Sequence, residues 1–329
     1  MILTPLKFPA PFTAMNKKSL TLISMLALST GQAFAADVIN PEGIITPTNL
    51  YTVTTTGVYS STCGTESVTS PLVGESDCKM DIYKPTALAP AAPADGLGRI
   101  AVIFIHGGGW REGSNAQFSN QSKYLASKGI TSFSIDYLLA VNLDSVKNPV
   151  RALENAKTAI RYIRANASFY GINPSKIVVS GGSAGGHLAA ALATVDYTGA
   201  NIRPNALALF NPVVNLNQYS AWTWGAIDKD AINPQLRLAS YPGRLPAGII
   251  FNGTNDTIAP YSAAQIFQST ATTTPSLISY TGRTHDFFGP NNIDDGICAT
   301  DTHDNGGVGC DYRDTLRRTL TFITGLGWF

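Results

Sequence analysis

A serine flanked by small residues is the first chemically suggestive feature of this sequence. Ser183 stands in the segment Gly181-Gly182-Ser183-Ala184-Gly185. Such a short pattern arises by chance in a chain rich in Gly and Ser, so its setting must carry the inference. An apolar run at residues 177–180 precedes it, and a small-residue helical pattern at 183–195 follows. This strand, sharp turn and helix are the setting of a nucleophilic serine. The alternative is a helix cap or phosphate-binding turn, although neither glycine pattern typical of phosphate binding is present.

A glycine cluster lies about 75 residues before the serine. The segment His106-Gly107-Gly108-Gly109-Trp110 follows the apolar run 100–105. Glycines at a strand end let backbone N–H groups turn toward a developing oxyanion without obstruction from a Cβ atom. We predict that Gly107, Gly108 and Ala184 donate these hydrogen bonds.

The chain has four histidines from which a general base can be chosen. His106 belongs to the glycine cluster, where we expect it to order the loop, and His187 lies one helical turn after the serine, where packing is expected. His285 lies in the segment Thr284-His285-Asp286-Phe287, which follows the apolar run at 276–280, and the base occupies the loop after the last strand when serine, acid and histidine occur in that order. We therefore predict His285 as the base, with His303, in a Gly- and Asp-rich segment, as the alternative.

The acid of such a triad must lie between the serine and the histidine. Asp256 comes just beyond the apolar run 247–251 and is our prediction. Asp228, Asp230 and Asp286 are the alternatives, each explicable as a surface charge. Asp256 itself could instead be a helix cap or turn residue.

Taken together, these motifs resemble the α/β-hydrolase carboxylesterases related to hormone-sensitive lipase and to the bacterial acetyl and feruloyl esterases. The resemblance rests on His106 to Trp110 and Gly181 to Gly186, with support from residues 161–174, and it extends over about residues 100–329. It implies a serine esterase that needs no metal and no cofactor. The chain departs from the family at Gly182, where these relatives usually have Asp, and at Tyr137-Leu138-Leu139-Ala140, which lacks their Arg.

Strand-like and helix-like patterns alternate along most of the chain. Alternation of this kind predicts an α/β fold with a mostly parallel central sheet covered by helices on both faces. The family resemblance implies that this is the α/β-hydrolase fold. Two runs near the N-terminus read as antiparallel strands. Strands are expected at residues 51–59, 79–83, 100–105, 131–136, 177–180, 206–210, 247–251 and 276–280, and helices at 116–128, 150–166, 183–195, 261–269 and 312–324.

The sequence divides into an N-terminal part and one catalytic core. We assign residues 36–95 to the N-terminal strands and an Ala/Pro-rich connector, and residues 96–329 to the core. Residues 215–244 fit neither a core strand nor a regular crossover, and we predict a lid insertion there. Trp222 and Trp224 lie in this segment, and with Trp110 they could form an aromatic wall for the substrate, although a buried tryptophan is more often part of the core.

The first 35 residues have the pattern of an upstream prefix and a signal peptide. Met15-Asn16-Lys17-Lys18 is a positive n-region, residues 20–28 are apolar, and Ala33-Phe34-Ala35 is a cleavage site, so the mature chain should begin near Ala36. The apolar stretch is too short to span a bilayer. We expect translation to start at Met15 and the protein to be secreted or periplasmic.

All four cysteines lie in the predicted mature chain. Since an exported protein meets an oxidising compartment, two disulfides are expected. Proximity in sequence favours Cys63 with Cys78 and Cys298 with Cys310. The alternative is that one or both pairs are free thiols.

A formal net charge of +1 argues against nucleic acid and anionic membranes as partners. The acidic segment 294–311 does not match the calcium-binding loop of an EF-hand, so a solvated loop is favoured. The expected partner is a small-molecule or polysaccharide-linked ester, with acetyl or feruloyl esters of plant polysaccharide as leading examples; the sequence does not indicate the oligomeric state. A serine peptidase or amidase on the same fold, and a hydrolase-like binding protein without activity, are the competing interpretations.

Overall fold

The computed structural model describes residues 38–39, 45–46, 48–60, 78–139, 148–195, 200–219, 228–289 and 310–329. Every described residue belongs to one compact unit within residues 35–329. Several sequence predictions fall outside the described residues: the signal peptide, Cys63, Trp222, Trp224, Cys298, His303, most of the acidic segment 294–311 and the side chain of Cys310.

An eight-stranded sheet with the order β10-β9-β8-β7-β5-β6-β4-β3 is the centre of the described fold. Neighbouring strands from β10 to β6 pair in parallel, whereas β4 pairs antiparallel with both β6 and β3. The fold class predicted from the sequence is therefore confirmed, including the antiparallel strands at the N-terminal end. The strands are β3 (Tyr51–Ser60), β4 (Cys78–Pro85), β5 (Arg99–Ile105), β6 (Thr131–Ile135), β7 (Ile172–Gly182), β8 (Ala206–Phe210), β9 (Gly248–Gly253) and β10 (Ser276–Tyr280), with a separate antiparallel pair formed by β1 (Val38–Ile39) and β2 (Ile45–Thr46).

Strand β5 shows why the central strands are continuous apolar runs. Ile103 and Ile105 join the core on one face of the sheet, while Val102 and Phe104 join the core on the other. All four side chains are at most 1% exposed. Because both faces are covered, residues 100–105 form a continuous apolar run, which is the pattern the sequence displays.

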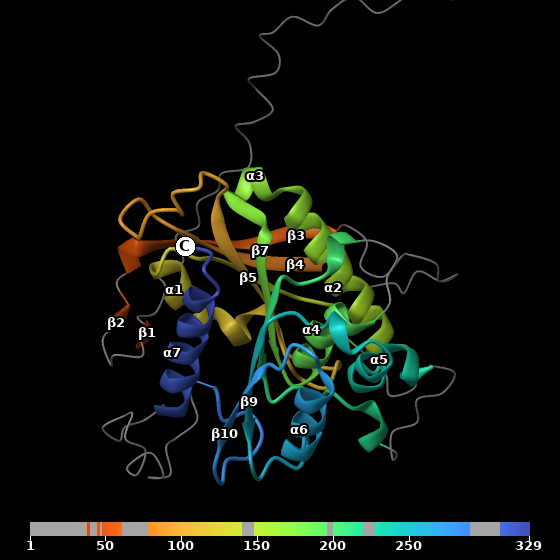
Figure 1. Cartoon of the computed structure of the whole chain (residues 1–329). Helices are drawn as coiled ribbons and strands as arrows, with labels where there is room; N and C mark the ends of the chain where they lie inside the picture. The colour runs from red at the N-terminus through yellow and green to blue at the C-terminus, as the bar shows by residue number, and fades with distance from the viewer. Residues whose placement is uncertain are drawn as a thin grey trace, which may run out of the picture. The chain divides into compact units, whose positions relative to one another are not determined.

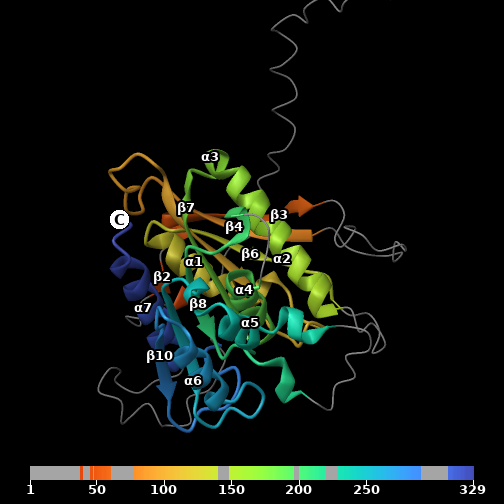
Figure 2. The ribbon, with the colours of Figure 1, turned by 45° about the vertical axis from the view of Figure 1, so that its right-hand side comes forward.

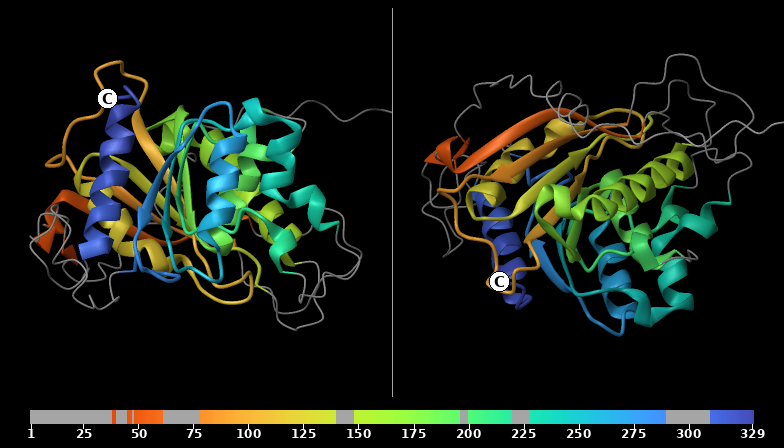
Figure 3. Two further views of the ribbon diagram at one scale, coloured as in Figure 1. Left: turned by 60° about the horizontal axis from the view of Figure 1, so that its bottom comes forward. Right: turned by 90° about the horizontal axis from the view of Figure 1, so that it is seen from above.

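Two layers of helices cover the sheet. Helices α2 (Asn148–Ala165), α4 (Ala184–Thr194), α5 (Pro234–Ser240) and α6 (Tyr261–Thr270) contribute to one core, and α1 (Ser119–Ser127) and α7 (Cys310–Gly325) contribute to the other. Figure 1 shows α1 and α7 on one side of the strands and α2, α4, α5 and α6 on the other, and the turned views of Figures 2 and 3 agree. None of the helices in the described parts is long and apolar enough to cross a membrane. The shorter elements are α3 (Ala167–Tyr170), η1 (Thr48–Leu50), η2 (Asn115–Phe118), η3 (Ala200–Ile202), η4 (Leu216–Gln218), η5 (Lys229–Ile232) and η6 (Pro242–Arg244).

The described part of the predicted insertion, residues 215–219 and 228–244, consists of η4, η5, α5 and η6. Helix α5 packs against α4 and α6, and Leu238 is fully buried there. Gln235 N–H donates to the Val214 carbonyl at 2.9 Å, and this bond links α5 to the segment that follows strand β8. These residues are therefore part of a helical layer, and a lid role for the segment stays a prediction.

Cys78 begins strand β4 and is 1% exposed. It is a disulfide cysteine, and the other half of its bridge lies outside the described residues. The pairing of Cys63 with Cys78, like that of Cys298 with Cys310, stays a prediction.

Helix α7 is attached to the edge of the sheet through the carboxylate of Asp314. Tyr280 Oη donates to it at 2.8 Å and Arg318 Nε at 2.6 Å, and Arg317 pairs with its other oxygen. Burial acts to raise the pKa of Asp314, but the hydrogen bonds from Arg318 and Tyr280 outweigh it and hold that pKa below its ordinary value. The charged carboxylate is therefore the form that fastens α7 to β10.

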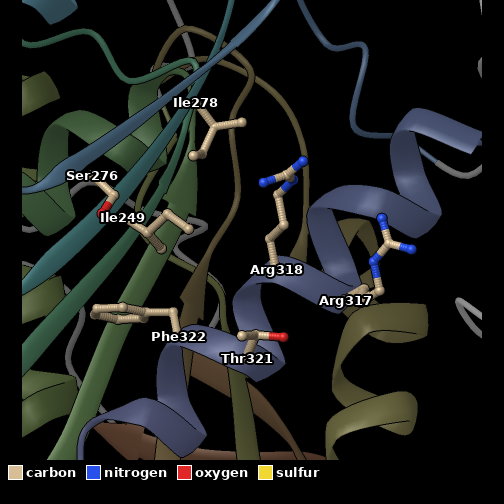
Figure 4. Close-up of a pocket in the computed structure, with 7 residues that line it drawn as sticks. All are labelled: Ile249, Ser276, Ile278, Arg317, Arg318, Thr321 and Phe322. Carbon is tan, nitrogen blue, oxygen red and sulfur yellow. The ribbon is translucent and has the colours of Figure 1, made fainter. Parts of the chain in front are cut away.

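A cavity of about 420 Å³ lies beside this attachment, between α7 and strands β9 and β10. Figure 4 shows Phe322 pointing toward the strands from α7, with Arg317 and Arg318 earlier on the same helix. The cavity contains none of the predicted site residues. Its lining consists of Ile249, Ser276, Ile278, Arg317, Arg318, Thr321 and Phe322.

Replacing the carboxylate with an amide should loosen α7. We expect Asp314→Asn to lower the free energy of unfolding at pH 7 by about 1–2 kcal/mol, since Arg317 and Arg318 reach solvent and recover part of the lost interaction. Because the native pKa of Asp314 is depressed, its contribution is complete above the ordinary carboxyl pKa of about 3.9 and is lost as the pH falls through the native value. Urea unfolding of both proteins at pH 7, 5 and 3 measures this.

The control is Glu154→Gln, which removes a single partly buried ion pair with Lys157 (2.7 Å) on helix α2. Because Gln keeps a hydrogen-bond acceptor for the ammonium group, this change should cost less than about 1 kcal/mol. Equal losses in the two variants, or a difference for Asp314→Asn that does not shrink at pH 3, would contradict the role of Asp314.

Candidate active site

Ser183 occupies the sharp turn between strand β7 and helix α4. Its backbone has φ 53° and ψ −116°, a conformation that residues with a side chain rarely adopt. The surroundings hold it there: Ser183 N–H donates to the Phe210 carbonyl at 3.0 Å, and the Ser183 carbonyl accepts from the N–H groups of His187 and Val213. A strained conformation that is held in place by surrounding hydrogen bonds is typical of functional sites.

Two glycines beside the serine are required by close contacts. A Cβ atom on Gly185 would lie 2.0 Å from the Ile105 carbonyl oxygen, because the start of α4 passes directly against the end of β5. A Cβ atom on Gly182 would lie 2.6 Å from the ring of Phe288. The departure from the family at Gly182 thus has a steric reason: in this chain an aromatic ring three residues after His285 fills the space of a side chain.

The structure brings the three predicted triad residues into one hydrogen-bonded chain. His285 Nε2 lies 2.8 Å from Ser183 Oγ, and His285 Nδ1 lies 2.8 Å from Asp256 Oδ2. The other oxygen of Asp256 accepts from the N–H groups of Ile258 and Ala259, each at 2.8 Å, and the carboxylate has no exposure. This arrangement keeps the Nδ1 proton toward Asp256 and leaves Nε2 to accept the hydroxyl proton.

The alternative acids lie elsewhere or in the wrong geometry. Asp286 is 3.7 Å from His285 Nε2, the nitrogen that faces the serine, and its side chain is 60% exposed. Asp228 caps η5 by accepting from the N–H groups of Asp230 and Ala231, and Asp228 and Asp230 are both exposed. Asp256 is the one of these carboxylates that contacts Nδ1.

Two further histidines are buried and structural. Burial lowers the pKa of His106 and of His187 to about 4, so both rings are neutral at neutral pH. His106 stacks on Tyr137 with ring centroids 4.1 Å apart, its Nδ1 lies 2.7 Å from the Gly107 carbonyl, and Tyr137 Oη donates to the same carbonyl. His187 Nε2 lies 3.0 Å from the Ile232 carbonyl. The expected ordering and packing roles are confirmed.

One of the predicted oxyanion donors, Gly107, is wrong. Gly107 N–H donates to the Gln117 side-chain oxygen at 2.6 Å, so it is not available to a substrate. Among the described residues, the N–H groups of Gly108 and Gly109 have no partner. Ala184 stands at the first position of α4, where an N–H group has no partner within the helix. Gly108, Gly109 and Ala184 therefore form the donor set that this geometry favours.

Trp110 does not form the open aromatic wall that the sequence allowed; the alternative, a place in the core, is the one found. It is 2% exposed, and its ring packs edge-on against His187 at 5.2 Å between centroids. Its substrate-binding role is thus corrected to a packing role. Trp222 and Trp224 lie outside the described residues, so their predicted contact with substrate stays untested.

Three residues at the site have no counterpart in the sequence predictions. Asn211 places its amide nitrogen 3.1 and 3.2 Å from the two ring nitrogens of His285, Gln117 binds the glycine loop, and Phe288 packs against Gly182. The position of Asn211 directly after strand β8 is the signal that could have found it, since side chains at the carboxyl ends of parallel strands converge on the site. Gln117 and Phe288 carry no such signal, because their contacts depend on loop paths.

The assembled groups provide what acyl transfer requires. A hydroxyl lies within hydrogen-bonding reach of an imidazole, a buried carboxylate orients that imidazole, and the residue after the serine begins a helix with an N–H group that has no partner within the helix. Such a set suits nucleophilic attack on a carbonyl group.

Comparison with known proteins agrees with this geometry. The family model described as BD-FAE matches residues 80–212. The acetylxylan esterase of Xylanibacter ruminicola is 31% identical over 137 residues, which are 41% of this chain and 27% of that protein. The arylacetamide deacetylase of Bos taurus is 38% identical over 100 residues, 29% of this chain and 24% of that protein. The matched stretches thus span about a quarter of the length of these curated relatives.

A solved structure matches over much more of the chain. The apo form of Thermogutta terrifontis esterase 2 is 30% identical and has a TM-score of 0.65, and the match covers 83% of this chain and 95% of that one. The shared fold is the one predicted from the alternation of strands and helices. Since the likeness extends over nearly the whole of a solved esterase, this chain belongs to the α/β-hydrolase carboxylesterases.

Proposed function

We propose that this protein is a serine carboxylesterase that cleaves short acyl or aromatic esters through an acyl-enzyme. The observation that carries the proposal is the hydrogen-bonded chain from Ser183 through His285 to Asp256, with both distances at 2.8 Å. Each member faces the atom it must act on, and the carboxylate is fully buried. A binding protein without activity would not require this alignment.

In the first half of the reaction, His285 Nε2 takes the hydroxyl proton as Ser183 Oγ attacks the ester carbonyl. The carbonyl oxygen becomes an oxyanion, which we assign to the N–H groups of Gly108, Gly109 and Ala184. Collapse of this intermediate breaks the bond to the alcohol oxygen, and the imidazolium returns the proton to the departing alcohol. The acyl group is then esterified to Ser183.

In the second half, water replaces the alcohol. His285 takes a proton from the water, the oxyanion forms again in the same place, and the acid leaves as Ser183 recovers its proton. Asp256 holds the ring orientation and stabilises the imidazolium in both halves without itself gaining a proton. Two N–H groups fix the Asp256 carboxylate, so it is oriented before substrate arrives.

Removing the hydroxyl tests the nucleophile. We expect Ser183→Ala to lower kcat for p-nitrophenyl acetate by about four orders of magnitude or more and to abolish labelling by a fluorophosphonate probe. The matched control is Ser180→Ala on the same strand, whose hydroxyl donates to the Ala208 carbonyl; it should keep both properties. Labelling of Ser183→Ala at the rate of the unaltered protein would refute the assignment.

Substrate preference is tested by a panel of esters and an amide. Thermogutta terrifontis esterase 2 has been solved with propionate and with butyrate bound, and the relative from Xylanibacter ruminicola is an acetylxylan esterase. We therefore expect kcat/KM for p-nitrophenyl acetate and butyrate to exceed that for the octanoate by about tenfold, a difference within the range that pocket size can produce. Acetylated xylan and methyl ferulate test the polysaccharide esters. Cleavage of a peptide amide as fast as the acetate ester would favour the peptidase alternative.

Export and disulfide formation belong to the same proposal. The n-region, apolar stretch and cleavage site of residues 15–35 support export, and the buried disulfide cysteine Cys78 supports an oxidising compartment. Expression of the full chain in a bacterial host should yield exported protein that begins near Ala36. Its intact mass should rise by about four hydrogen masses on reduction, because each disulfide takes up two. A mature end before Met15, or an unchanged mass, would contradict the proposal.

A further inference from the structure

Asn211 is a buried residue in a strained backbone conformation at the end of strand β8. It has φ 33° and no exposure, and its N–H donates to the Phe251 carbonyl at 2.7 Å. Asparagine tolerates the left-handed region better than most residues, but glycine adopts it without strain. Glycine would therefore satisfy the backbone conformation, so the conformation does not explain why the residue has an amide side chain.

That side chain lies against His285. Its nitrogen is 3.1 Å from Nδ1 and 3.2 Å from Nε2 of the imidazole. Both ring nitrogens already have partners in the ring plane, Asp256 and Ser183. An atom in that plane and equally near both nitrogens would overlap the ring carbon between them, so the amide lies over the face of the imidazole. The amide oxygen is buried without a hydrogen-bond partner in the described part of the chain, so no other polar contact accounts for the amide.

We propose that Asn211 is a positioning residue for His285 in ester hydrolysis. The inference rests on the proposed function, because it assigns His285 as the base. Two hydrogen bonds in the ring plane leave the imidazole able to tilt about the line that joins them. A rigid, neutral group on the ring face limits this tilt, and it keeps Nε2 directed at Ser183 Oγ while the ring gains and loses its proton. Small misalignments of reacting groups are costly in rate.

Among the described residues, few charged and titratable groups lie around the ring. Asp256 approaches from the loop after β9, Asp286 from the histidine's own loop at 3.7 Å from Nε2, and the Ser183 hydroxyl from the β7 turn. Asn211 approaches from the end of β8 and carries no charge. A charge placed at Asn211 would therefore add a third carboxylate beside the imidazole, in contact with its face.

The first test removes the amide without straining the backbone. We expect Asn211→Gly to lower kcat for p-nitrophenyl acetate by about 10- to 100-fold with little change in KM, and to slow fluorophosphonate labelling by the same factor. Its urea unfolding midpoint should stay the same or rise. A role confined to folding would instead lower that midpoint and leave kcat per folded molecule unchanged.

The second test uses a variant of almost identical shape. Asn211→Asp places a negative charge on the ring face, which favours the imidazolium and raises the pKa of the base. The acid limb of the kcat/KM profile should therefore move to higher pH by about one unit or more. The matched control is Asn173→Asp, another buried asparagine near the opposite end of β7, whose side chain accepts from Ser175 N–H; its acid limb should not move.

The outcomes separate this inference from the proposed function. If Asn211→Gly keeps the kcat of the unaltered protein, or if Asn211→Asp leaves the acid limb in place, the positioning role is overturned, while an inactive Ser183→Ala still supports the serine mechanism. Retained activity in Ser183→Ala overturns both. The aspartate variant decides the matter even if the glycine variant does not fold.

Discussion

The close approach of helix α4 to the end of strand β5 is the constraint on which the site depends. The position that a Cβ atom of Gly185 would take lies 2.0 Å from the Ile105 carbonyl oxygen, so only glycine allows the contact. This contact joins the nucleophile turn to the strand that leads into the glycine loop. Strand β7, which ends in the nucleophile turn, pairs in parallel with β5, which leads into the glycine loop. Because both strands belong to one closely packed sheet, the position of the serine relative to the loop N–H groups is fixed.

A second packing contact fixes the position of the loop that carries the base, His285. Phe288 packs into the space beside Gly182 and stacks near Phe118 and Phe210, at 5.7 and 4.9 Å between ring centroids. His285 lies three residues earlier on the same loop. The aromatic cluster therefore determines where the histidine loop meets the serine turn, and the Asp256 hydrogen bond then sets the rotation of the ring. In this chain a side chain at position 182 would compete with the ring for the same space.

The sequence predicted the sheet well, because most of its eight strands are apolar or alternating runs with clear ends. Strand β7 begins at Ile172, five residues before its predicted start, since Ser175 and Lys176 interrupt the apolar pattern. Chain order, together with the position of each residue after an apolar run, led to Ser183, Asp256 and His285. Two contacts were not predictable, because each depends on where a loop side chain points rather than on a pattern along the chain. They are the hydrogen bond from Gly107 N–H to Gln117 and the contact of Asn211 with His285.

Backbone strain is found at the same edge of the sheet as the site. The non-glycine residues with positive φ in the described chain are Trp110, Ser183, Asn211 and Asp286, and they follow the carboxyl ends of β5, β7, β8 and β10. Parallel strands bring these ends to one edge, where the chain must turn sharply for side chains and N–H groups to face one point. Each such conformation costs on the order of 1–3 kcal/mol. The cost is tolerated because β5, β7 and β8, which precede three of these turns, are largely buried. The strain is therefore concentrated near His285 and is absent from the described strands themselves.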